Sequence, residues 1–148
     1  MSKNDPEKSY PGDNAAVQDI LRLAEAYHAA ATALFQNAQR GAPLSYAPAR
    51  LCSIHAIELC LNAFLRSRGV PNSEIRARVH NLADTTFIDA LRLRKKTADH
   101  LVAMTEKREY LISRYAPEFV EQHSELNRLT ATLNEVMSKV TKYIFLGR

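Results

Sequence analysis

Polar residues are tightly confined within the segment 45–69, and this confinement limits the folds open to the chain. Between positions 51 and 65 the polar residues are Ser53, His55, Glu58 and Asn62. At about 100° per residue the last three fall within roughly 60° of one another on a helix, and the rest of the circumference is apolar. A helix with one narrow polar stripe belongs in the middle of a bundle, where other helices cover most of its surface.

The composition is that of one all-α domain. The chain has 148 residues, only four Gly and no Trp, and this length is sufficient to bury a core. We expect residues 1–14 to form a disordered polar tail and residues 15–148 to form a single helical domain. The first fourteen residues contain no apolar run, and no stretch approaches the roughly 20 apolar residues that span a bilayer. We therefore expect a cytoplasmic protein with no membrane contact.

The spacing of apolar residues predicts an antiparallel bundle of four long helices, with one or two short helices between the second and the third. Asp13 or Asn14 is expected to cap a first helix that reaches Ala38. The central helix is entered through Ser45 and Pro48 and ends at Gly69.

The second half of the chain supplies the remaining helices. Ser73 is expected to cap a short helix that reaches Val79, and a second short piece is expected over residues 82–94. Thr97 is the predicted N-cap of the third long helix, which ends near Tyr115 because Pro117 disfavours helix at the residue before it. The last helix carries its apolar face from Phe119 to Ile144.

The cysteines and the charge restrict the chemistry. Cys52 and Cys60 would lie about 12 Å apart along one helix, which is too far for a disulfide. The net charge of +4 favours weak association with an anionic partner such as a nucleic acid or a nucleotide. There is no zinc-type spacing of Cys and His and no Gly-rich phosphate loop, so we predict neither a metal nor a cofactor.

Three segments, in order and spacing, resemble the HEPN family, which comprises compact helical bundles of prokaryotic defence, toxin–antitoxin and nucleotidyltransferase-associated proteins. They are Ala56–Gly69, His80–Leu82 and Arg114–Pro117. They resemble the family's central helix ending in glycine, its histidine-aspartate-leucine junction and its arginine-tyrosine-proline turn. Asn62 stands where the family commonly has a lysine, and Ala116 interrupts the last motif.

These segments predict one polar cluster, either structural or ligand-binding. Its members would be Glu58, Asn62, His80, Arg114 and Tyr115. Because an unpaired charge in an apolar helix is costly, Glu58 should have a cationic partner, and we expect Arg114 within about 4 Å of it. His80 either orients its turn by bonding to the backbone or contacts a ligand.

The resemblance implies a non-catalytic or weakly catalytic binding module. It would form a homodimer and act with a partner protein of the nucleotidyltransferase or toxin–antitoxin type, or with an RNA or nucleotide ligand. A purely structural helical interaction protein, with no ligand in its cleft, is another possibility.

An enzymatic alternative is a metal-independent endoribonuclease of the toxin or defence type. Many HEPN nucleases use an arginine and a histidine separated by four to six residues. This spacing occurs here at Arg50 and His55, and again at Arg94 and His100. An imidazole can move the proton of a ribose 2′-hydroxyl, and a guanidinium can stabilise charge on the phosphoryl oxygens. Arg50 and His55 are the candidate catalytic pair because both project from the central helix.

Overall fold

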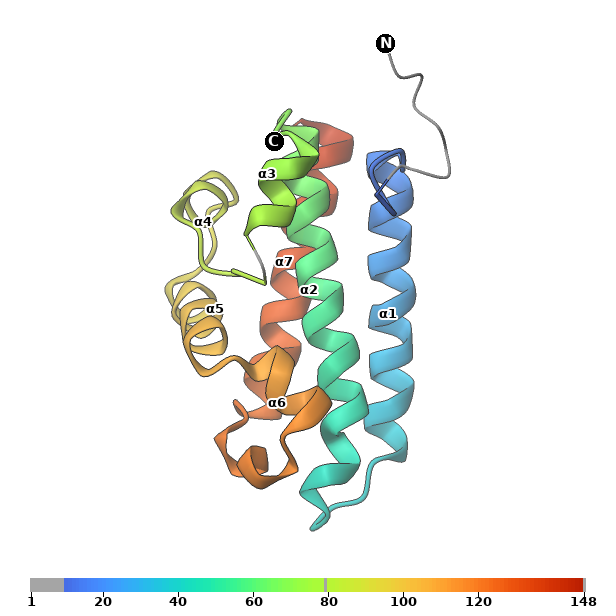
Figure 1. The fold of residues 1–148 in the computed structure, drawn as a ribbon, viewed down its shortest axis with the longest axis vertical. Helices are drawn as coiled ribbons and strands as arrows, with labels where there is room; N and C mark the ends of the chain where they lie inside the picture. Colours follow the sequence, from blue (N-terminus) through green and yellow to red (C-terminus); the bar gives the residue numbers. More distant parts are fainter. Residues whose placement is uncertain (1–9, 79, 148) are drawn as a thin grey trace.

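A computed structural model describes residues 10–78 and 80–147, which form helices and turns and no strand (Figure 1). Three helices within this range have 21 residues each: α1 (Val17–Asn37), α2 (Ala47–Ser67) and α7 (Leu126–Leu146). The predicted all-α class is confirmed.

Helix α2 is the centre of the fold. It runs antiparallel to α1 and in the same direction as α7 (Figure 1). Ala56, Ile57, Cys60, Ala63 and Phe64 have no exposed surface at all. The same core includes side chains from four other helices, among them Leu21 of α1, Phe87 of α4, Leu101 of α5 and Val136 of α7. The central position predicted for this helix is confirmed.

The third predicted long helix is two helices. Helix α5 (Lys95–Lys107) ends at Arg108, which adopts the left-handed conformation with φ 55° and ψ 46°, and α6 (Glu109–Tyr115) begins directly after it. The prediction of one continuous helix was therefore wrong, but its predicted end near Tyr115 is confirmed. The break allows Glu109 to turn into the interior, where it is 1% exposed.

Several predicted helix starts differ from the structure. Helix α1 begins after Ala16 with no side-chain cap, so neither Asp13 nor Asn14 occupies that position. Thr97 lies inside α5, where its hydroxyl donates to the Glu135 carboxylate at 2.7 Å. Ser73 lies inside α3 (Asn72–Ala77). The predicted end of that helix at Val79 falls outside the described residues.

The connecting elements are short. Helix α4 (Thr85–Ala90) is shorter than the piece predicted over residues 82–94, and Asp84 caps it by accepting from the Thr86 N–H at 2.7 Å. Two 3₁₀ turns complete the chain, η1 (Pro43–Tyr46) before α2 and η2 (Pro117–Gln122) before α7. Phe119 belongs to η2 and is 45% exposed, so it is not part of the last helix.

Of the predicted disordered tail, residues 1–9 lie outside the described part of the chain. Residues 10–14 differ from that prediction, because they form a turn in which the Asp13 N–H donates to the Tyr10 carbonyl at 3.0 Å. No helix among the described residues is long and apolar enough to cross a membrane. Cys52 and Cys60 are both free, as predicted, and burial raises the pKa of the Cys60 thiol to about 12.

Candidate functional site

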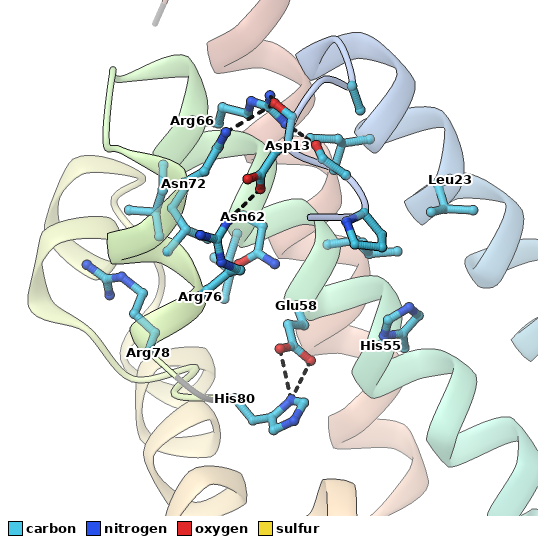
Figure 2. Close-up of a pocket in the computed structure, with 18 of the residues that line it drawn as sticks. Asp13, Leu23, His55, Glu58, Asn62, Arg66, Asn72, Arg76, Arg78 and His80 are labelled. Carbon is cyan, nitrogen blue, oxygen red and sulfur yellow. Dashed lines mark hydrogen bonds and ion pairs between the residues drawn. The ribbon is translucent and has the colours of Figure 1, made fainter. Parts of the chain in front are cut away.

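A cavity of about 800 Å³ opens beside α2, between the start of α1, helix α3 and the loop that leads to α4 (Figure 2). His55, Glu58 and Asn62 all line it. The prediction that these three side chains share one face of the central helix is therefore confirmed. The polar stripe is half-buried and faces this cavity.

The lining of the cavity combines an apolar wall with several cations. The apolar side chains include Ile20, Leu23, Leu59, Leu65, Ile75, Leu82 and Phe87. The cations are Arg66 at the end of α2, Arg76 on α3 and Arg78 just after α3. Pockets of this size and composition accommodate small molecules with an apolar body and a charged group.

Glu58 is paired with His80, and not with Arg114 as the sequence predicted. The His80 Nδ1 lies 2.9 Å from one carboxylate oxygen of Glu58 and 3.0 Å from the other (Figure 2). The imidazole also stacks on the Tyr110 ring at a centroid distance of 4.3 Å. His80 has a φ of 63°, a conformation that is uncommon outside glycine. The loop therefore holds this imidazole in a defined orientation through a carboxylate, and not through the backbone.

His55 lies on the same stripe, one turn before Glu58. Its ring meets the Tyr27 ring edge-on at 4.5 Å, and its buried Nδ1 has no hydrogen-bond partner among the described residues. Burial lowers the pKa of His55; Glu58 opposes this shift, and Arg114 and His80 add to it. His55 is therefore neutral at pH 7.

The other predicted members of the cluster are placed differently from one another. The Asn62 side-chain amide faces the cavity and makes no hydrogen bond within the described residues. Arg114 is exposed on α6 and acts on His55 only at a distance. Tyr115 is 73% exposed, and Tyr110 provides the aromatic contact to His80 in its place. The structure thus brings Glu58, Asn62 and His80 to one cavity, and leaves Tyr115 outside.

Arg50 does not lie beside His55. Residues five positions apart on a helix are separated by about 140°, so these two side chains project in different directions. Arg50 is 9% exposed and donates to the Ser124 carbonyl at 2.6 Å. The Glu109 carboxylate accepts from the Ser124 N–H at 2.7 Å and from its hydroxyl at 3.0 Å. Arg50 therefore belongs to a buried network that joins α2, α6 and the segment before α7.

The electrostatics of this buried network follow from its enclosure. Burial lowers the pKa of Arg50, and the nearby Glu109 carboxylate partly offsets that shift. Burial likewise raises the pKa of Glu109, against the hydrogen bonds from Ser124 and the charge of Arg50. Each charge stabilises the other where water is excluded, which indicates a structural role for Arg50 in place of the predicted catalytic one.

The second arginine–histidine spacing gives no pair either. His100 is 6% exposed, and its Nδ1 lies 2.7 Å from the Thr132 hydroxyl. Burial lowers the pKa of His100 to about 4, with further contributions from Arg128, Arg50 and Lys107. Arg94 is not among these cations. It precedes α5, and its backbone N–H donates to the Glu135 carboxylate at 2.7 Å.

The predicted site did not include several polar residues that line the cavity, among them Asp13, Arg66, Asn72 and Arg76. Arg66 carried a signal, because it follows Asn62 by four positions and so continues the polar stripe by one turn. The other three had none that a pattern could reveal, since they depend on where α3 and the segment before α1 lie.

Comparison of the chain with models of protein families, with curated proteins and with solved structures finds no match. No three His, Cys, Asp or Glu side chains in the described ranges are grouped as metal ligands would be.

The buried network predicts that replacing Arg50 with Leu destabilises the protein. The change leaves the Ser124 carbonyl without its donor and removes from the buried Glu109 carboxylate one of the two cations that act on it, Lys107 being the other, so we expect a loss of about 2–4 kcal/mol in the free energy of unfolding. Urea denaturation measures this. Arg22→Leu is the control because that side chain is 78% exposed, and its effect should stay within about 0.5 kcal/mol. Equal stability of the two variants would contradict a structural role for Arg50.

The buried His100 predicts a loss of stability in acid. The pKa of this imidazole is about 4 in the folded chain, against about 6.5 when unfolded. The unfolded chain therefore binds more protons between these values, and stability falls as the pH drops from about 6.5 towards 4, by roughly 2–3 kcal/mol. Thermal denaturation at pH 7 and pH 4.5 should show a smaller difference for His100→Asn, which keeps a polar group near Thr132. An unchanged pH dependence in this variant would show that other groups cause the acid sensitivity.

Proposed function

We propose that this chain is a HEPN-like binding module that holds a nucleotide, or the phosphorylated end of an RNA, in the cavity beside α2. In this proposal α1, α2, the α5–α6 pair and α7 correspond to the four members of the family's antiparallel bundle. The cavity lies where that bundle leaves the polar stripe of its central helix uncovered.

The observation that carries the proposal is the side-chain amide of Asn62, which makes no hydrogen bond to any residue that the structure describes. A side-chain amide offers both donors and an acceptor, which is the pattern that the edge of a nucleobase requires. Asn62 lies on the cavity wall near apolar side chains such as Leu59 and Leu65, against which the face of a base can pack. A polar group beside an apolar wall can fix the orientation of a ligand that packs against that wall.

The cations of the cavity support the phosphorylated class of ligand. Arg66 and Arg76 lie near Asn62 in Figure 2. Guanidinium groups bind phosphate through two parallel hydrogen bonds, so these side chains match a phosphoryl group better than a neutral one. The net charge of +4 favours the approach of such a ligand.

The proposal predicts that Asn62→Leu weakens nucleotide binding at least tenfold. The change removes the hydrogen bonds of the amide to the base while it keeps the approximate volume of the side chain, and one such bond corresponds to roughly a factor of ten in affinity. Isothermal titration calorimetry with AMP, ADP and a short 5′-phosphorylated oligoribonucleotide measures this.

The matched control for this experiment is Asn134→Leu, the same substitution at an exposed position of α7 outside the cavity. It should leave the affinity unchanged. If the wild-type protein binds none of the three probes, the binding proposal is wrong, and a purely structural interaction protein becomes the better description. Equal affinities of the two asparagine variants would place the ligand elsewhere.

A second candidate function is a metal-independent endoribonuclease, supported by the Glu58–His80 pair and not by Arg50 and His55. A carboxylate that binds Nδ1 of an imidazole fixes the tautomer and leaves Nε2 for proton transfer. His80 lines the cavity and is one-third exposed, so its free edge can reach a bound ribose. Arg114 on α6 is an exposed cation whose charge acts on His55, which lines the same cavity.

This candidate predicts RNA cleavage in excess EDTA that depends on His80. Because general acid–base catalysis typically contributes 10²–10⁴-fold, His80→Asn should lower the rate by about that factor, and Arg50→Lys should have little effect. Cleavage of a labelled oligoribonucleotide provides the measurement. His28→Asn, on α1 and outside the cavity lining, is the control. Absence of cleavage by the folded wild-type protein, or retention of cleavage by His80→Asn, would exclude this mechanism.

A further inference from the structure

The segment 10–14 lies at the edge of the cavity and is held there by side chains of α2 and α3 (Figure 2). Arg66 donates to the Gly12 carbonyl at 2.6 Å and also to the Asp13 carbonyl. The Asn72 amide donates to the same Asp13 carbonyl at 3.1 Å. Two helices therefore direct their polar side chains at one short piece of backbone.

The side chain of Asp13 completes this arrangement. Its carboxylate lies 2.5 Å from the Arg76 guanidinium, and the same guanidinium lies over the Tyr10 ring at 4.5 Å. The Asp13 carboxylate is therefore an anion bound to a cationic site. It does not cap α1, since that helix begins after Ala16 with no side-chain cap.

All the donors of Arg66, Asn72 and Arg76 described above point to oxygen atoms of this one segment. A phosphate presents three acceptor oxygens and up to two negative charges. Two guanidinium groups and an amide that all donate to oxygens of the two neighbouring residues Gly12 and Asp13 are a donor set that also suits a phosphate.

We propose that Arg66, Asn72 and Arg76 form a phosphate-binding site, and that the segment Tyr10–Asp13 occupies this site as an intramolecular competitor. The inference rests on the proposed function, because it assigns the phosphate of the nucleotide to a defined part of the same cavity. It adds that binding of the ligand requires the segment to leave.

Release of the segment is feasible because its contacts are few and partly exposed. The side chains of Arg76 and Asp13 are 36% and 28% exposed, and exposed ion pairs contribute little to stability. Tyr10 is 59% exposed and belongs to no helix. A tethered competitor lowers the apparent affinity of a ligand by the fraction of molecules in which the site is free.

The test uses inorganic pyrophosphate, which has no base and so probes the phosphate site independently of Asn62. Asp13→Asn removes the competing charge at almost constant shape, and we expect pyrophosphate and ADP to bind about three- to fivefold more tightly to this variant. Arg76→Gln should weaken both at least tenfold. Asp99→Asn is the matched control, because it removes one carboxylate charge from an exposed ion pair on α5.

A fluorescent reporter follows the segment directly. The chain contains no Trp, so Tyr10→Trp introduces a single indole that retains the contact with Arg76. Saturation with pyrophosphate or ADP should change its emission at the concentrations at which calorimetry detects binding.

The outcomes separate this inference from the proposed function. If ADP binds in an Asn62-dependent manner but Asp13→Asn has no effect on affinity and the indole emission does not change, the competitor is excluded and nucleotide binding stands. If pyrophosphate binds with the expected dependence on Arg76 and Asp13 but nucleotides bind no better, the phosphate site stands without base recognition. If neither probe binds, both proposals fail.

Discussion

The rest of the structure depends on the burial of α2, since each charged side chain on this helix is paired with another part of the chain. Arg50 near its start is paired with the segment before α7. Glu58 in its middle is paired with His80 in the loop after α3. Arg66 near its end is paired with the segment before α1. One helix thus determines the position of three connections that are far apart in the sequence, and the cavity lies between the last two.

The degree of burial separates the structural charges from those available to a ligand. Both oxygens of Glu109 accept from Ser124, and the residue is only 1% exposed, so another molecule cannot reach its carboxylate. Glu58 is 20% exposed and faces the cavity with its single partner. Both are carboxylates on helices, one near the Arg50 guanidinium and the other beside the His80 imidazole. Because desolvation is far larger at Glu109, disruption of its network costs stability, whereas changes around Glu58 alter a surface that solvent already reaches.

The local sequence pattern was sufficient to predict the long helices and the polar stripe of α2. It was insufficient where a contact between residues far apart in the sequence determines the structure. The periodicity of apolar residues located α1, α2 and most of α7, and it placed His55, Glu58 and Asn62 on one face. The break at Arg108 accompanies the contact of Glu109 with Ser124, fifteen residues later. Local helix propensity cannot predict such a contact.

The errors at the site have the same origin. Asp13 is of a residue type that commonly caps helices, yet its carboxylate binds Arg76, 63 residues away. Arg114 was a reasonable cation for Glu58, but the left-handed backbone of His80 brings an imidazole closer. Tyr110 and not Tyr115 contacts His80, and Tyr115 is 73% exposed.

The cavity cations differ in how firmly their partners are held, and this difference would decide where an anion enters. The partner of Arg78 is Asp84, whose carboxylate also caps α4, so its displacement would expose the start of that helix. The partner of Arg76 is Asp13, which lies in a turn outside any helix. An entering anion therefore replaces Asp13 at a lower cost in free energy than Asp84. A phosphate bound at the Arg76 end of the cavity would leave the apolar wall, Asn62 and His55 to contact the rest of the ligand. The Glu58–His80 pair would then lie beside the ligand but not next to its phosphate.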